Sequence, residues 1–400
     1  MRNMYSKSIA TVAAFLCATS ISMANPTSIN LQKPVLQQDT VKSASKSTSH
    51  IVSSTKNGHK GNYIYINNGA HVEIKYNGNI VLTDNFKDVK SIAPKGYLHY
   101  LKKENGEKRE LQIESDKNGQ LSRTYFVNGK QVAYEPAGKQ WLQQAMPDII
   151  TKTGIGLEAM VQDVYKKRGA KGVLAEADKL NSDNSKLRMI SYLMAQPNLP
   201  TSDLKLALQH AATTSSSDYE LSKILRKVSA ADLAKDDVAI SYLQATQKIS
   251  SDYEMRKALT HLLEVPNLSS KAAGMAVKTL TSVASDYEKS KVIQQLAGQK
   301  NFFTDNYKAT FEAIRSISSD YEKSKSISSI VSKQQLSQAQ YQALFPVVTT
   351  ISSDYEKSKV LRNIAPKIPD NATALREDYK KAAKTINSDY EYRKAIDALK

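Results

Sequence analysis

The chain has 400 residues, of which 24% are charged and 40% are apolar. Its net charge is +17, from 56 Lys and Arg against 39 Asp and Glu. Enough apolar residues are present to form a core, which excludes wholesale disorder, and the length predicts about two or three domains. The one cysteine, Cys17, lies in the N-terminal leader, which excludes a disulfide framework or a cysteine zinc site in the rest of the chain.

The first 24 residues predict a secretory signal peptide. A basic start precedes a short apolar run over residues 9–21, and small residues at its end predict cleavage between Ala24 and Asn25. A retained membrane anchor is the alternative, and the bulky Leu16 disfavours a lipid anchor at Cys17. We therefore expect an exported protein, periplasmic or extracellular, with no transmembrane segment in the mature chain.

Residues 25–57 are rich in Ser, Thr, Lys and Gln, which predicts a disordered linker. Residues 58–140 then alternate apolar and polar residues, as strands with one buried face do, and five Asn-Gly pairs predict tight hairpin turns between them. We expect an antiparallel β-meander of about seven or eight strands, covered by a second sheet or by the first helices. The strand-like runs are Tyr63–Ile66, His71–Ile74, Ile80–Leu82, Tyr97–Leu101, Leu111–Ile113 and Thr124–Val127.

Residues 141–400 predict an α-helical repeat domain. The motif Ser-Asp-Tyr-Glu recurs every 34 or 35 residues, after a decayed copy at residues 182–184. Each copy is followed by an apolar pattern of helical period, a break and a second such pattern. The whole chain is therefore expected to be an α+β multidomain protein, in which the β-meander precedes a right-handed α-solenoid of about seven two-helix units.

The motif is interpreted as a helix start. In a capping box, the Ser hydroxyl accepts from the backbone N–H of the Glu three residues later, and the Glu carboxylate accepts from the Ser N–H. The predicted Ser–Glu caps are Ser217 with Glu220, Ser251 with Glu254, Ser285 with Glu288, Ser319 with Glu322, Ser353 with Glu356 and Ser388 with Glu391. The tyrosines expected to pack between adjacent units are Tyr219, Tyr253, Tyr287, Tyr321, Tyr355 and Tyr390.

Little in the sequence points to catalysis. The six histidines show no metal-ligand spacing on a helix; His71 and His99 could meet across strands, but a third ligand is lacking. Tyr-x-x-x-Lys, as at Tyr321 and Lys325, is catalytic in short-chain dehydrogenases, but its recurrence in six units favours a structural role. We expect no catalytic residues, no metal and no cofactor.

The Ser-Asp-Tyr-Glu-Lys repeats after a β-rich segment resemble a group of exported bacterial helical-repeat proteins, HEAT-like or tetratricopeptide-like, whose function is unknown. The resemblance covers about Gly61 to Lys400 and implies a location and an architecture, with no reaction. The layout also looks like the extracytoplasmic part of some membrane-bound, sensor-type zinc metallopeptidases. Their His-Glu-x-x-His motif is absent here, so no peptidase activity carries over.

These features together predict a non-enzymatic exported scaffold whose solenoid surface binds a protein or an extended polymer. A second interpretation is an envelope-surface protein that binds anionic polymers through its diffuse positive charge. A third is an enzyme with an unrecognised site in the β-domain. Nucleic acid is not expected as a partner, because the basic residues are spread along the chain rather than concentrated in a stripe.

Overall fold

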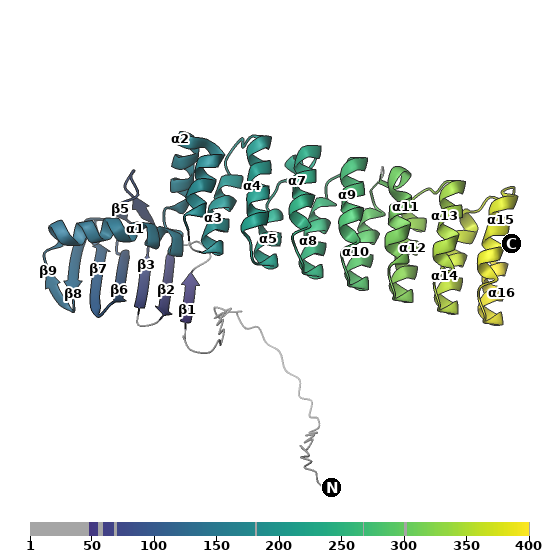
Figure 1. Cartoon of the computed structure of the whole chain (residues 1–400), viewed down its shortest axis with the longest axis horizontal. Helices are drawn as coiled ribbons and strands as arrows, with labels where there is room; N and C mark the ends of the chain where they lie inside the picture. The colour runs from purple at the N-terminus through teal and green to yellow at the C-terminus, as the bar shows by residue number, and fades with distance from the viewer. Residues whose placement is uncertain are drawn as a thin grey trace, which may run out of the picture.

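The computed structural model describes residues 48–54, 59–67, 70–180, 182–266, 268–299 and 302–399. Within these ranges, an antiparallel β-sheet at one end of the molecule is followed by an elongated array of helices (Figure 1). The predicted α+β arrangement, an antiparallel sheet followed by helical repeats, is confirmed. The predicted signal peptide, with its cleavage site between Ala24 and Asn25, lies outside the described residues and stays a prediction.

The main sheet has the spatial order β1-β2-β3-β6-β7-β8-β9, and every neighbouring pair in it is antiparallel. Its strands are β1 (Thr48–Ser54), β2 (Lys60–Asn67), β3 (Ala70–Asn77), β6 (Tyr97–Glu104), β7 (Glu107–Ser115), β8 (Leu121–Val127) and β9 (Lys130–Val132). β4 (Ile80–Leu82) and β5 (Val89–Ile92) form a separate hairpin. Asn105-Gly106 closes the β6–β7 hairpin with positive φ angles of 52° and 82°, as its sequence predicts.

All the strand runs predicted from alternation fall within strands, but the structure adds β1, β5 and β9. β1 lies in residues 25–57, for which the composition predicts a disordered linker, so that prediction is wrong for Thr48–Ser54. β1 is an edge strand that pairs with β2 along its whole length. Because ladder hydrogen bonds use the backbone, an edge strand forms without the apolar composition on which the linker prediction depended.

One face of the sheet is covered by α1 (Lys139–Thr153), as Figure 1 shows. The ring centroid of Trp141 lies 5.0 Å from that of Tyr100 and 5.6 Å from that of Tyr125, and all three side chains are buried. The alternating buried residues of β3, β6 and β7 complete this core. α1 therefore packs with the sheet, although the predicted domain boundary at residue 140 assigns nearly all of it to the helical domain.

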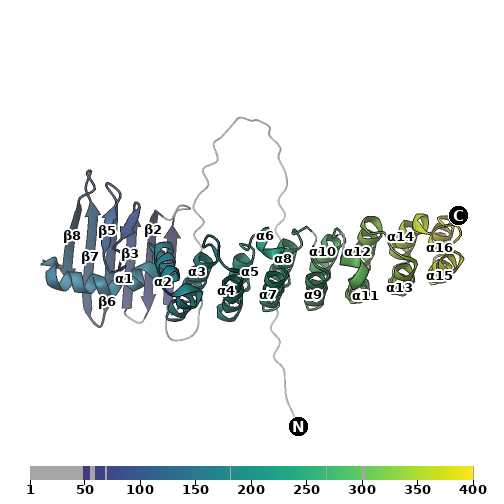
Figure 2. The ribbon, with the colours of Figure 1, turned by 90° about the horizontal axis from the view of Figure 1, so that it is seen from above.

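The remaining helices lie in two rows along the molecule (Figure 2). The capped-helix row contains α3 (Asp183–Met194), α5 (Asp218–Leu225), α8 (Asp252–Leu262), α10 (Asp286–Leu296), α12 (Asp320–Lys333), α14 (Asp354–Ile364) and α16 (Asp389–Asp397). The second row contains α2 (Leu157–Asp178), α4 (Thr201–Thr214), α7 (Asp236–Thr246), α9 (Ser270–Leu280), α11 (Phe302–Arg315), α13 (Gln338–Val348) and α15 (Thr373–Ala383), with the short α6 (Ala230–Leu233) before α7. Each helix packs against the next of its row, and apolar residues fill the space between the rows. Among the described residues, no helix is long and apolar enough to cross a membrane.

Successive units are joined through the Asp of the motif. Its carboxylate accepts a hydrogen bond from the backbone N–H of the Ser that begins the next capped helix. The N···O distances are 2.7 Å for Ser251 to Asp218, 2.7 Å for Ser285 to Asp252, 2.8 Å for Ser319 to Asp286, 2.7 Å for Ser353 to Asp320 and 2.9 Å for Ser388 to Asp354. Each unit therefore supplies half of the cap of the unit that follows it.

This bond changes the expected capping box. Each of the six Ser hydroxyls accepts from the backbone N–H of its own Glu, as the motif predicts. The reciprocal bond from the Ser N–H to the Glu carboxylate is a wrong prediction from Ser251 to Ser388, because the preceding Asp already occupies that N–H. The complete box forms instead at α13, where Ser337 N donates to Gln340 Oε1 at 2.8 Å.

The C-terminal ends of the capped helices are joined in the same way, by side chains of the next unit. Gln295 Nε2 donates to the carbonyl of Thr260 at 3.1 Å, and Gln334 Nε2 donates to the carbonyl of Ala297 at 2.7 Å. The last carbonyls of a helix have no partner within the helix, so these bonds satisfy groups that would otherwise need water. Successive units are thus tied at both ends of the capped helices.

Three buried lysines tie the two rows together. Lys289, Lys323 and Lys357 occupy the same position in successive units, and each is at most 5% exposed. Their ammonium groups donate to oxygens that follow the second-row helix of the same unit, as Lys357 Nζ does to the Thr385 carbonyl at 2.9 Å. The negative end of that helix dipole offsets part of the cost of burying the charge. Burial lowers the pKa of Lys323 below its usual value.

Removing one inter-unit carboxylate should destabilise the array. Asp286→Ala leaves the N–H groups of Ser318 and Ser319 without their acceptor, which lies 3.0 and 2.8 Å away. Asp236→Ala is the matched control, because it removes an exposed first-turn charge from α7. Urea unfolding should show a loss of about 1–2 kcal/mol for Asp286→Ala and less than about 0.5 kcal/mol for the control. Equal losses of stability in the two variants would contradict this prediction. They would show that Asp286 stabilises the protein only through the dipole of its own helix, and not through the hydrogen bonds to the next unit.

Candidate ligand-binding face of the helical array

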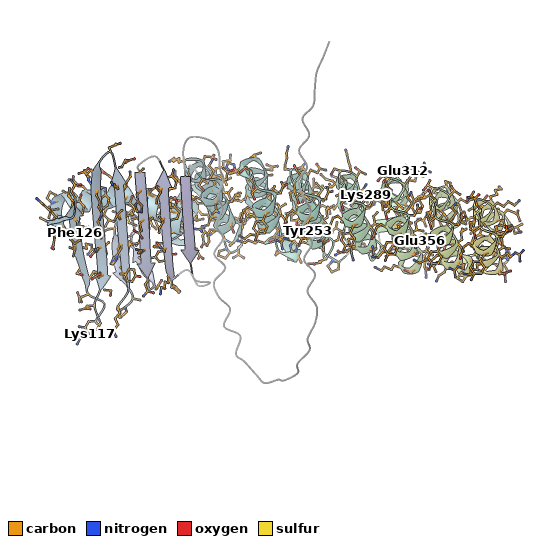
Figure 3. The ribbon with its side chains drawn as sticks, turned by 90° about the horizontal axis from the view of Figure 1, so that it is seen from below. Lys117, Phe126, Tyr253, Lys289, Glu312 and Glu356 are labelled. Carbon is orange, nitrogen blue, oxygen red and sulfur yellow. The ribbon has the colours of Figure 1, made fainter. Side chains whose placement is uncertain are left out.

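The tyrosine of each motif lies on the outside of the array. Figure 3 labels one of them, Tyr253, on α8 in the capped-helix row. Six tyrosines at this position are each 51% to 67% exposed: Tyr219, Tyr253, Tyr287, Tyr321, Tyr355 and Tyr390. The expectation that these rings pack between adjacent units is therefore wrong, and their recurrence is not explained by the core.

Two tyrosines of the second-row helices are packed in the core. Tyr242 and Tyr379 are completely buried. Tyr242 donates its hydroxyl to the carbonyl of Ala258 at 2.9 Å, and Tyr379 donates to the carbonyl of Ala395 at 2.7 Å. Burial raises the pKa of both phenols above the usual value. Tyr242 and Tyr379 are therefore part of the core, and the six motif tyrosines are not.

A lysine follows each exposed tyrosine by one helical turn. Together the two series form what we call the tyrosine–lysine ridge: the six tyrosines above and Lys223, Lys257, Lys291, Lys325, Lys359 and Lys394. In five units the ammonium lies 3.9 to 5.5 Å from the ring centroid of its own tyrosine. Two ridge lysines lie near the ring of the preceding unit, at 5.8 Å for Lys257 to Tyr219 and 5.7 Å for Lys359 to Tyr321. The ridge therefore alternates rings and cations from unit to unit.

The acidic groups of the motif lie beneath this ridge. Five of the six Asp carboxylates are held by the Ser N–H groups of the next unit, and four of the six Glu residues are at most 9% exposed. Glu356 pairs with Lys359 at 3.2 Å and Glu391 with Lys394 at 3.3 Å, from positions that are far less exposed than the lysines. Contact with Tyr390, together with Glu391, raises the pKa of Lys394. A ligand approaching the ridge therefore meets aromatic rings and ammonium groups first.

Two open pockets lie beside the ridge in the capped-helix row. The central pocket, between α10, α12 and α14, has a volume of about 480 Å³. It is lined by Gln294, Lys325, Ser328, Ser329, Val331, Ser332, Asn363 and Lys367. The N-terminal pocket, between α3 and α5, has a volume of about 300 Å³ and is lined by Asn184, Leu187, Arg188, Ser191, Tyr192, Glu220, Ile224, Lys223 and Lys227. One ridge lysine, Lys325 or Lys223, lines each pocket, so pocket and ridge are continuous.

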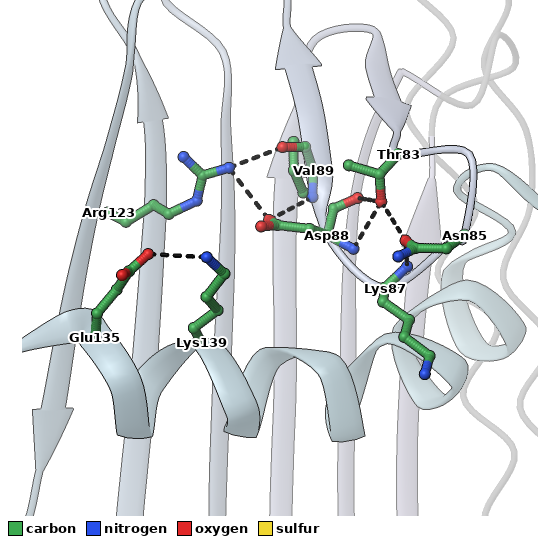
Figure 4. Close-up of polar contacts among 8 residues, drawn as sticks. All are labelled: Thr83, Asn85, Lys87, Asp88, Val89, Arg123, Glu135 and Lys139. Carbon is green, nitrogen blue, oxygen red and sulfur yellow. Dashed lines mark hydrogen bonds and ion pairs between the residues drawn. The ribbon is translucent and has the colours of Figure 1, made fainter.

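A polar cluster in the β-domain has a structural explanation (Figure 4). Arg123 Nη2 on β8 donates to Asp88 Oδ1 at 3.1 Å and to the Val89 carbonyl at 2.8 Å. Asp88 N donates in turn to Thr83 Oγ1 at 3.1 Å, across the loop between β4 and β5. These bonds fasten the β4–β5 hairpin to the main sheet. Nothing in the cluster pairs a nucleophile with a base.

The histidines of the sheet do not form a site. In the β3–β6 pairing, His71 lies opposite Lys103 and His99 lies opposite Lys75, so the two imidazoles are four positions apart. His99 Nε2 lies 3.1 Å from Glu114 Oε1 on β7. Within the part of the chain that the structure describes, no three His, Cys, Asp or Glu side chains gather as metal ligands would.

Comparison with known proteins adds no function. No family model and no curated protein matches the chain. A solved structure described as "Computational Design of Self-Assembling Cyclic Protein Homooligomers" is similar, with 13% identity over 61% of this chain and 92% of that one. Its TM-score of 0.14 is too low for the likeness to bear on fold or function.

The two classes of tyrosine should respond differently to truncation. Tyr321→Ala removes an exposed ring and should change the free energy of unfolding by no more than about 0.5 kcal/mol. Tyr242→Ala empties a fully buried site and should cost about 3–5 kcal/mol. Urea unfolding of both variants measures the difference. A large loss for Tyr321→Ala would return the motif tyrosine to a structural role and remove the reason for treating the ridge as functional.

Proposed function

We propose that the protein is a non-enzymatic scaffold that binds an extended ligand along its capped-helix row. The observation that carries this proposal is the tyrosine–lysine ridge, which repeats an exposed aromatic ring and a cation in six successive units. In the same motif, Ser caps its helix, Asp caps the next one, and Glu is buried in the first turn of four of the six units. Tyr is the one residue of the four whose side chain the fold leaves in solvent.

An exposed ring in every unit suits a ligand that also extends over several units. In five units an exposed ring lies within 5.5 Å of the ammonium of its own lysine, which gives a flat apolar surface next to a positive charge. Each such contact is weak, but contacts made by one continuous ligand add through effective concentration. Six weak contacts in a line therefore give firm binding to a long ligand and little binding to a short one.

The finer architecture and the location belong to this proposal. We infer that the array is a right-handed solenoid of about seven units, with the ridge along one of its edges. We also infer that the protein acts after export, in the periplasm or outside the cell, where the predicted signal peptide would place it. Because most motif Asp and Glu side chains are bonded or buried, the charges that face solvent along the ridge are mainly those of lysines. This supports an anionic envelope polymer as the ligand, with a protein partner as the alternative.

Successive loss of rings should weaken binding in steps. The probes are dextran, poly-L-glutamate and polygalacturonate, each in affinity electrophoresis with the full chain. We expect at least one polymer to be retained, with affinity falling about threefold for Tyr321→Ala and more than about 100-fold when all six tyrosines are alanine. The matching Tyr→Phe series keeps the rings and should bind within about twofold of the parent chain. Unchanged affinity in the sixfold alanine variant, or no retention by any of the three polymers, contradicts the proposed function.

A further inference from the structure

We infer that the extended ligand is an acidic polysaccharide, and that the central pocket holds one of its carboxylate-bearing sugars. This inference rests on the proposed function and adds the chemical class of the ligand. Three observations support it: the groups that line the pocket, the position of the pocket next to a ridge tyrosine, and the recurrence of a similar arrangement at the N-terminal end of the ridge.

The lining of the central pocket matches a hydroxylated anion. Two ammonium groups, of Lys325 and Lys367, and the amides of Asn363 and Gln294 lie around it, and no carboxylate does. Asn363 Nδ2 donates to Ser328 Oγ at 3.1 Å, so the amide oxygen is the group that this side chain can offer as an acceptor. Hydroxyls of a sugar both donate and accept, as the Ser, Asn and Gln side chains do, while its carboxylate needs the lysines. A volume of about 480 Å³ is ample for one sugar ring.

The pocket opens beside a stacking surface. Lys325 lines it, and the same ammonium lies 5.4 Å from the ring centroid of Tyr321. Lys359, from the next unit, lies 5.7 Å from that centroid. The C–H face of a sugar ring is apolar and slightly positive, and it packs on the negative face of an aromatic ring. A sugar on Tyr321 would therefore have two cations next to it, and the neighbouring sugar would enter the pocket.

The N-terminal pocket repeats this chemistry. Lys223 lines it and lies 5.5 Å from the ring centroid of Tyr219. Lys227 and Arg188 add two further cations, and Glu220, the one carboxylate in the lining, is paired with Lys223 at 3.3 Å. Two cationic, hydroxyl-binding pockets on one ridge fit a chain of acidic sugars better than a single free sugar acid.

An acidic peptide fits these surfaces less well. Extended peptides are held by pairing with a sheet edge or by apolar pockets for anchor side chains. The central pocket contains one apolar side chain, Val331, among polar and cationic ones, and the ridge belongs to helices. The polar lining is the feature that separates a sugar from a peptide of the same charge.

The test measures the affinity of the full chain, at physiological salt, for two polyanions of matched length and charge: polygalacturonate and poly-L-glutamate. We expect polygalacturonate to bind at least about tenfold more tightly. Lys325→Gln and Asn363→Ala should each reduce polygalacturonate affinity about five- to tenfold, and Lys325→Arg should restore most of it. Lys271→Gln is the matched control, because it removes an exposed lysine of α9 in the second row, and it should change affinity less than about twofold.

The outcomes distinguish this inference from the proposed function. Equal affinity for the two polyanions would overturn the acidic-sugar inference and leave a general polyanion scaffold. Tighter binding of poly-L-glutamate would also overturn it and favour an acidic peptide, with the proposed function intact if the tyrosine series still weakens binding. Equal effects of Lys325→Gln and Lys271→Gln would remove the central pocket from the site, since the loss would then reflect net charge alone. Circular dichroism of each variant confirms that the helices are intact.

Discussion

The hydrogen bond from the Ser N–H to the Asp of the preceding unit, which recurs in five units from Ser251 to Ser388, is the constraint on which the array depends. A helix N-terminus has N–H groups with no partner within the helix, and here one of them is satisfied by a carboxylate from the neighbouring unit. The cap is therefore complete only when two units stand side by side in the correct register. Because the next motif is bound at the same point each time, Tyr321 and Tyr355 come to the same height on their helices and form a line.

The local half of this arrangement could be predicted from the sequence, and the non-local half could not. Ser319 and Glu322 are three residues apart, so the capping bond within one helix follows from the motif alone. Asp286 and Ser319 are joined across a whole unit, and a first-turn Asp has a sufficient local explanation in the helix dipole. β1 could not be predicted for the same reason. Its formation depends on pairing with β2, and the composition of residues 48–54 alone gives no sign of a strand.

The exposure of the motif tyrosines could have been found from helical geometry. Tyr321 precedes the buried Ile330 by nine positions, and at about 100° per residue the two side chains point to opposite sides of α12. The aromatic character of Tyr favoured a core position, and that preference was wrong here. The pockets had no such signal: Lys325, Asn363 and Gln294 come from three units and meet only because those units stack.

The different positions of the motif side chains allow one short sequence both to stabilise the array and to carry the binding surface that we propose. Ser and Asp bond backbone N–H groups, where changes cost stability, while Tyr and its lysine point to solvent, where changes cost little. Helices of one row pack about 8–10 Å apart, so the rings recur at that interval. A flexible linear polymer can follow such a line by small torsional adjustments, whereas a rigid folded partner can match only a few rings at once. Uniform repetition of Tyr across six units therefore favours a polymer, since a rigid partner would need different side chains at different contacts.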